Sequence, residues 1–188
     1  FDPAGFYTEF KYSTINMNLN GGLGAITNTN VLLDSNVRMS SAATLHQNGR
    51  DIWITYTAVD TSLVYSRLLT ATGLQPAVIS NFNVPINPSN QVPNRTRFSP
   101  DGKWLAFSDP VANQCFLLSF DNATGIASNA IDIGPNINPP SLLGFIPFAL
   151  EFSPNPERLY RSEFNAIGST GDLVQFDLSS NIPATIQA

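Results

Sequence analysis

Two charged residues of opposite sign occupy equivalent places in a repeated segment of this chain. Arg97 stands directly before Phe-Ser-Pro, and so does Glu151. If the two repeats pack side by side, we expect the carboxylate and the guanidinium to meet as a partly buried ion pair that fixes the register of neighbouring units. The same groups could also hold a polar ligand, because together they offer several donors and acceptors. Arg97 and Glu151 are therefore candidate binding residues as well.

Two further residues join this candidate binding set. Arg95 lies two positions before Arg97, and the other cations are scattered along the chain. Phe145 belongs to the apolar part of segment 136–148, which is rich in Pro and Asn, as is segment 83–94. We expect both segments to be long rim loops, where binding residues concentrate on a rigid framework.

No constellation typical of catalysis is present. His46, the single histidine, falls at a turn position where the other repeats have serine, so we expect it to cap a turn. Cys115, the single cysteine, falls in an apolar run, which predicts a buried, inert thiol. Glycoside hydrolysis would need a second acid facing Glu151 across a cleft, and Glu163 is the other candidate. We therefore predict no catalytic residues and a protein that is not an enzyme.

Metal and cofactor sites are not expected either. One histidine and one cysteine cannot supply the usual ligands of a transition metal. Calcium bound by loops is the alternative, because carboxylates and carbonyls suffice for it. Six aspartates near predicted strand ends could contribute: Asp101, Asp109, Asp121, Asp132, Asp172 and Asp177.

The elements that would position these residues repeat along the chain. Segments 45–53, 98–106 and 152–160 can be aligned, and each reads as an apolar residue, a polar turn and a new apolar run. That pattern predicts a β-hairpin that recurs at a period of about 50 residues, which is typical of propellers. Pro156 stands where the other two copies have Gly49 and Gly102, so the third turn must avoid a positive φ.

Each hairpin is followed by two more apolar segments, so each repeat predicts a four-stranded antiparallel propeller blade. We expect an all-β fold, a partial β-propeller ring of about three and a half blades, where closed rings have about four to eight. The expected boundaries are a partial blade at 1–36 and blades at 37–90, 91–140 and 141–188. The fourth strand of the last blade is expected at 184–186. A second copy or missing blades would complete the ring.

Composition limits the partners. The formal net charge is −5 and the pI is near 4.6, so the basic surface that neutralises phosphates is absent. We predict no nucleic-acid binding and, because no apolar run is long enough, no membrane insertion. Few lysines and many Asn, Ser and Thr residues favour an exported protein.

Several segments resemble known propellers. FSPDGKWLAF at 98–107 and FSP at 152–154 resemble the WD-like repeat of the periplasmic Tol-associated propeller family. A longer resemblance is to the N-terminal propeller region of large surface proteins of gliding bacteria, which are exported by the type IX secretion system. It implies a ring of about seven blades and an extracellular or cell-surface location, and it implies no catalytic residues. Its segments are YSTINMNLNGGLG at 12–24, FDNATGI at 120–126, LEFSP at 150–154, LY at 159–160 and QFDLSS at 175–180.

The prediction from sequence is thus a non-catalytic binding or structural module of a secreted or cell-surface bacterial protein. It would recognise protein or glycan through its rim loops. The alternative is the half-ring of a propeller enzyme acting on polysaccharide, of the glycoside hydrolase or lyase type, with its catalytic residues in absent blades.

Overall fold

A computed structural model describes residues 9–59, 61–84, 95–109, 114–134, 145–165 and 171–179, and all structural statements concern these residues. They form antiparallel β-sheets, together with a short 3-10 turn, η1 (Asn20–Gly22). No α-helix occurs in these ranges.

The strands fall into four consecutive sheets, which we name the N-terminal hairpin and blades 1, 2 and 3. The N-terminal hairpin is β1 (Glu9–Asn16) and β2 (Ala25–Ser35). Blade 1 is β3 (Val37–Leu45), β4 (Ile52–Ala58), β5 (Leu63–Thr70) and β6 (Gly73–Asn81). Blade 2 is β7 (Arg95–Phe98), β8 (Trp104–Asp109), β9 (Gln114–Asp121) and β10 (Ile126–Asp132). Blade 3 is β11 (Phe145–Phe152), β12 (Arg158–Asn165) and β13 (Gly171–Asp177).

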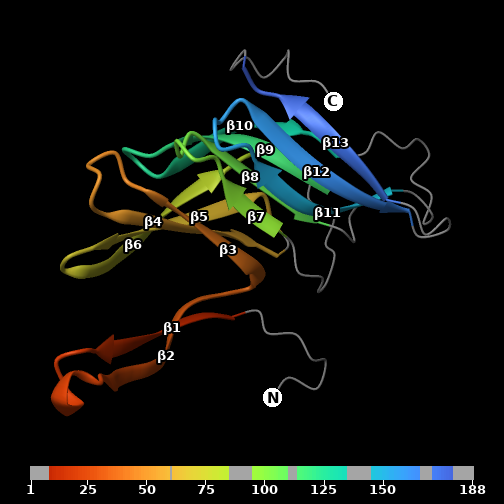
Figure 1. Ribbon diagram of the computed structural model, residues 1–188. Coiled ribbons are helices and arrows are strands. Elements are labelled where there is room, and N and C mark those ends of the chain that lie inside the picture. Colours follow the sequence, from red (N-terminus) through yellow and green to blue (C-terminus); the bar gives the residue numbers. More distant parts are fainter. Residues whose placement is uncertain are drawn as a thin grey trace, which may run out of the picture.

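The sheets follow one another as the blades of a propeller do. Each strand of a blade pairs with the next one in sequence, and the blades lie face to face (Figure 1). The first strands of neighbouring blades contact each other, β3 with β7 and β7 with β11, so they form the inner edge of the arc. The predicted all-β fold, a partial β-propeller ring, is confirmed.

Blade 2 shows why these sequences form blades. Along β8, Leu105 and Phe107 pack in the core shared with blade 1, whereas Trp104 and Ala106 pack in the core shared with blade 3. Side chains alternate between the two faces of a strand, so a blade between two neighbours needs apolar residues at successive positions. The unbroken apolar run 115–118 in β9 meets that need, and all four of its side chains are buried.

The three hairpin turns share one backbone pattern. The N–H of His46, Ser99 and Ser153 each donates to the carbonyl five residues later, at 2.8, 3.0 and 2.9 Å. The hydroxyls of Ser99 and Ser153 accept the returning backbone N–H at 2.9 and 3.1 Å. Gly49 and Gly102 have positive φ, and no described residue between 153 and 157 does. The third turn therefore differs around Pro156 as the sequence predicted.

One segment predicted to be a loop is a strand. Phe145 and Ile146 begin β11, where they pair with Asn165 and Phe164 of β12. Pro147 is accommodated because the register shifts directly after it, where a ladder hydrogen bond is already interrupted. The rest of the predicted rim loops, 85–94 and 135–144, and the predicted strand 184–186 lie outside the described residues.

A small set of contacts clamps blade 1 to blade 2. The indole Nε1–H of Trp53 donates to the carbonyl of Asn122 at 2.9 Å, and the Gln47 N–H donates to the same carbonyl at 3.1 Å. Gly125 lies against the Trp53 ring with φ of +78°, and a Cβ built there would lie 2.6 Å from Trp53 Cη2. Glycine at 125 is therefore required by both the backbone and the neighbouring blade.

We expect Gly125→Ala to lower the free energy of unfolding by about 3 kcal/mol, from left-handed backbone strain plus overpacking against Trp53. Gly49→Ala is the matched control, since Gly49 has φ of +69° and open space around its Cβ position. It should cost only about 1 kcal/mol. Denaturant titration of both variants measures the difference. Equal losses of unfolding free energy would contradict a role of Gly125 in the contact between blades 1 and 2.

Candidate functional site at the inner edge

The inner edge brings Arg97 of β7 and Glu151 of β11 together. Arg97 Nε lies 3.3 Å from Glu151 Oε2, across the boundary between blades 2 and 3. The predicted ion pair is present, but it is more exposed than expected, with side-chain exposures of 46% and 71%. The pair lies at the edge of the sheets rather than between them, so water and solutes reach both groups.

Successive side chains of β7 point to opposite faces of the strand, and this alternation determines which of them lie beside Glu151 at the inner edge. Thr96 is buried, and its N–H donates to Ser40 Oγ of β3 at 3.0 Å, which joins β7 to blade 1. Arg95 and Arg97 flank Thr96 and share the opposite face of the strand. Arg97 is fixed further, because its Nη1 donates to the Thr96 carbonyl at 3.0 Å.

The structure describes Arg95 and Phe145, the other two binding residues predicted from sequence, in less detail. Arg95 begins β7 and is exposed, and its N–H donates to Ser108 Oγ at 3.4 Å. Phe145 begins β11, and its side chain lies outside what the structure describes. The inner edge thus brings Arg97 and Glu151 into contact, with Arg95 on the same face as Arg97.

The second acid considered for glycoside hydrolysis does not face Glu151. Glu163 of β12 is 8% exposed and forms an ion pair with Arg161, two positions earlier on the same face of the strand. Arg161 is 4% exposed, and its guanidinium carbon lies 5.0 Å from the centroid of the Phe176 ring. No motif in the sequence indicated this buried pair, and Glu163 does not form with Glu151 the facing carboxylates that a glycosidase needs.

Neither His46 nor Cys115 is arranged for nucleophilic catalysis. His46 Nδ1 accepts the Asn48 N–H at 3.0 Å and Nε2 lies 3.1 Å from the Ala123 carbonyl, so turn and neighbouring blade occupy both ring nitrogens. Burial raises the pKa of the Cys115 thiol to about 12. His46, Ser99 and Asp101 line one groove of about 560 Å³. There, the Ser99 hydroxyl donates to Asp101 Oδ1 at 2.6 Å rather than to the imidazole.

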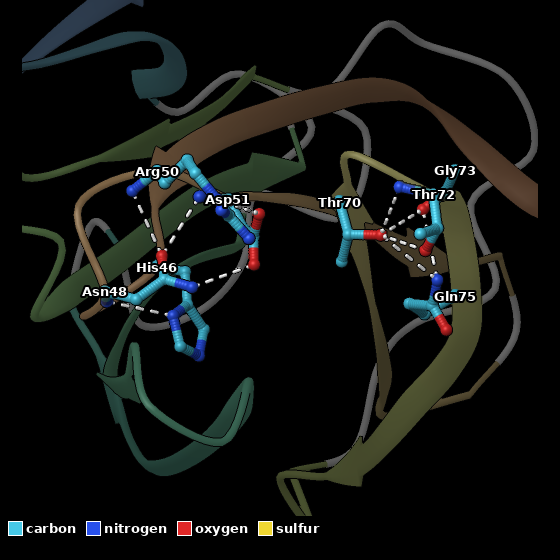
Figure 2. Close-up of polar contacts among 8 residues, drawn as sticks. All are labelled: His46, Asn48, Arg50, Asp51, Thr70, Thr72, Gly73 and Gln75. Carbon is cyan, nitrogen blue, oxygen red and sulfur yellow. Dashed lines mark hydrogen bonds and ion pairs between the residues drawn. The ribbon is translucent and has the colours of Figure 1, made fainter.

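Blade 1 carries a second polar site, which the sequence analysis did not identify. We name it the blade 1 pocket; it has a volume of about 390 Å³. Figure 2 shows the two turns that line it, one with Arg50 and Asp51 and the other with Thr70, Thr72 and Gln75, where the Thr70 hydroxyl points towards Thr72 and Gln75. Leu68 and Ala71 complete its lining.

Within the described ranges, no group of three or more His, Cys, Asp or Glu residues could hold a metal ion. No helix in this part of the chain is long and apolar enough to cross a membrane.

Comparison with known proteins supports the fold. The periplasmic gluconolactonase PpgL of Pseudomonas aeruginosa is similar with a TM-score of 0.62 and 11% identity, over 99% of this chain and 51% of that one. A protein from Lactobacillus plantarum gives a TM-score of 0.58 and 16% identity, over 93% and 49%. A candidate 6-phosphogluconolactonase of Bacteroides uniformis gives 0.52 and 14%, over 100% and 55%. This chain spans about half the length of these structures.

No protein-family model and no curated protein sequence matches this chain. At such low identities, the structural likeness shows the shared fold alone. These similar structures define the class of protein, a β-propeller.

The comparison corrects one prediction from sequence. We predicted that the chain is not an enzyme, because no catalytic motif could be found. The similar structures include a gluconolactonase and a candidate 6-phosphogluconolactonase, so the lack of a motif does not exclude a chain of this fold from the enzymes, and that prediction is wrong. Groups at the inner edge come from different blades, as Arg97 and Glu151 do, and a site built in this way leaves no contiguous motif in the sequence.

The ion pairs formed by Glu163 and Glu151 of blade 3 should differ in their effect on stability. Glu163→Gln leaves the Arg161 charge buried without its counterion, and we expect unfolding free energy to fall by about 3–5 kcal/mol. Glu151→Gln, at the exposed pair, should change it by less than about 1 kcal/mol. Combining Glu163→Leu with Arg161→Met should restore most of the loss. Thermal and denaturant unfolding test this, and equal effects of the two glutamines would contradict it.

Proposed function

We propose that this chain forms half of the ring of a β-propeller enzyme that hydrolyses a sugar-derived lactone, with Arg97 and Glu151 at the reaction site. The observation that carries the proposal is the water-accessible contact of 3.3 Å between Arg97 Nε and Glu151 Oε2 on the first strands of adjacent blades. The similarity in fold to a gluconolactonase and to a candidate 6-phosphogluconolactonase supports the choice of substrate class.

The two groups supply complementary steps of ester hydrolysis. Glu151 accepts a proton from a water molecule, and the resulting hydroxide attacks the lactone carbonyl carbon. Arg97 donates hydrogen bonds to the carbonyl oxygen as negative charge develops there. The ring C–O bond then breaks, and the leaving oxygen takes the proton from Glu151. The product is a hydroxy acid, which releases its carboxyl proton to water, and the resulting carboxylate binds the Arg97 guanidinium.

This geometry favours a lactone over a polysaccharide glycosidic bond. Cleavage of a glycosidic bond requires two carboxyl groups facing each other, one as acid and one as base or nucleophile. Glu151 has an arginine as its charged partner, and Glu163 is buried against Arg161. A carboxylate beside a guanidinium is better suited to the attack of water on a lactone carbonyl group than to cleavage of a glycosidic bond.

We expect the chain to accelerate hydrolysis of glucono-lactone above the spontaneous rate, and Glu151→Gln to reduce that acceleration by about 10²–10⁴-fold. Arg97→Met should reduce it by about 10²–10³-fold. Glu157→Gln, which changes an exposed glutamate in the turn before β12, is the matched control and should leave the rate unchanged. Base uptake at constant pH measures the reaction. Spontaneous rates in every variant, or a loss in the control equal to that in Glu151→Gln, would overturn the assignment.

We also propose that the arc is completed by further blades, supplied by a second copy or by additional sequence. Large apolar side chains are exposed on both end sheets: Ile15 at 62% and Ile26 at 64% on the N-terminal hairpin, and Leu173 at 70% on β13. Ile15 and Ile26 pair across the N-terminal hairpin, and an exposed apolar patch usually marks an interface. This chain also spans about half the length of the similar structures.

We expect this chain on its own to form a dimer in solution, which light scattering over a concentration series measures. Replacing Ile15, Ile26 and Leu173 by serine should shift the mass to that of a monomer, because the apolar contact is lost. Serine at Ile79, an exposed isoleucine on the outer strand β6 of blade 1, is the control. A monomer at all concentrations would contradict ring completion by a second copy.

The proposed setting is an extracellular or cell-surface location in a bacterium. The resemblance of segments 12–24 and 120–126 to type IX-secreted gliding proteins supports it, as does the Asn-, Ser- and Thr-rich composition. Recovery of the protein from the cell-surface or culture fraction would test the location, and exclusive recovery from cytosol would contradict it.

A further inference from the structure

We propose that the blade 1 pocket is a binding site for a neutral sugar, separate from the inner edge. Figure 2 shows its polar groups on two turns of the same blade, one with Asp51 and the other with Thr70. It is a shallow depression of about 390 Å³ that is open to solvent.

The first observation is a nearly buried carboxylate, that of Asp51, at a position that differs from blade to blade. The carbonyl of Asp51 accepts the His46 N–H, as those of Trp104 and Arg158 accept the Ser99 and Ser153 N–H in blades 2 and 3, so the three residues are equivalent. Arg158 pairs with Asp177 at 2.7 Å. Trp104 is 5% exposed and fills the core towards blade 3, whereas Asp51 is 8% exposed. A buried charge costs free energy that an apolar residue would not, so folding alone does not explain it. Such local conflicts tend to mark functional positions.

The second observation is that these polar groups keep hydrogen-bonding capacity. Asp51 Oδ2 accepts Asn48 Nδ2 at 2.8 Å, which orients the carboxylate, while Oδ1 lies 3.5 Å from Nε of Arg50. The Arg50 side chain is 76% exposed, so that contact is loose and a ligand can replace it. Among the described residues, Gln75 uses its Nε2 towards Thr70 and Gly73, and no hydrogen bond involves its Oε1.

The chemistry of the lining selects the class of ligand. Asp51 repels anions, and the Arg50 guanidinium beside it disfavours a cation. Leu68 and Ala71 are the apolar members of the lining, too few to bind an apolar ligand. A neutral sugar fits, because each of its hydroxyls both donates and accepts, as the carboxylate, amide and guanidinium require.

Two of the polar residues that line the pocket, Asp51 and Gln75, are not repeated in blade 2. In the aligned sequence of blade 2, Trp104 replaces Asp51 and Ala127 replaces Gln75, and both replacements are buried in the cores. The turn itself is shared, since Ala-Thr-Gly occurs at 71–73 and at 123–125. Blade 2 therefore offers a control turn without the pocket.

The experiment is ligand-observed saturation-transfer NMR on this 188-residue chain, with methyl glucoside, methyl galactoside, a β-linked glucose oligosaccharide and glucuronate as probes. We expect transfer to at least one neutral sugar, with a dissociation constant on the order of 1 mM, and weaker transfer to glucuronate. A preference for the oligosaccharide over the methyl glycosides would identify a glycan chain as the ligand, and equal binding would identify a free sugar.

Three substitutions test the site. Gln75→Ala and Thr72→Val should each weaken binding, by about three- to tenfold, and Asp51→Asn by about tenfold or more. Thr124→Val, the same change in the equivalent turn of blade 2, should leave binding unchanged. Glu151→Gln should also leave it unchanged, which separates this site from lactone hydrolysis.

The proposal is overturned if no neutral sugar shows saturation transfer, or if glucuronate binds more tightly than the neutral sugars. It is also overturned if Gln75→Ala and Thr72→Val bind as the unaltered chain does. Should Asp51→Asn fail to fold, the two other substitutions decide the outcome, because both residues lie outside the cores.

Discussion

The need of each blade to bury both of its faces governs this structure. A single antiparallel sheet can keep one polar face in water. A blade lies between two neighbours, so neither of its faces is open to water. Blade 2 meets this need on both sides, with Leu105 and Phe107 in one core and Trp104 and Ala106 in the other. The end sheets have a neighbour on one side only, and Ile26 and Leu173 are exposed on them. Burial of a large apolar side chain contributes about 1.5–3 kcal/mol, so the proposed ring completion would gain stability by covering them.

Polar groups hold neighbouring blades in register where apolar packing alone would let them slide. The Trp53 indole donates to the carbonyl of Asn122, and the Thr96 N–H donates to the hydroxyl of Ser40. Each bond joins two blades through a backbone group, and such bonds require one relative position because hydrogen bonds depend on distance and angle. Arg161 and Glu163 both lie on β12. Their buried ion pair is therefore within one strand and does not link blade 3 to blade 2.

The inner edge and the blade 1 pocket illustrate two ways in which this fold creates a site. At the inner edge, Arg97 and Glu151 come from different blades and meet because the first strands of the blades are adjacent. In the blade 1 pocket, both turns belong to one blade, and the site exists because Asp51 stands where blade 2 has Trp104. The first depends on the relative position of two blades, and the second on residues of blade 1 that blade 2 does not share.

The amino-acid sequence by itself determined the repeat, the turns and the strands, because these depend on local backbone preferences and on alternation along a strand. It also predicted the contact between Arg97 and Glu151, since equivalent positions of adjacent repeats lie side by side. It could not show that this pair is open to water, that Glu163 is turned towards Arg161, or that Phe145 begins a strand. Those features depend on which face of a strand meets which neighbour and on where the register shifts beside Pro147. Only the packing of one blade on the next decided them.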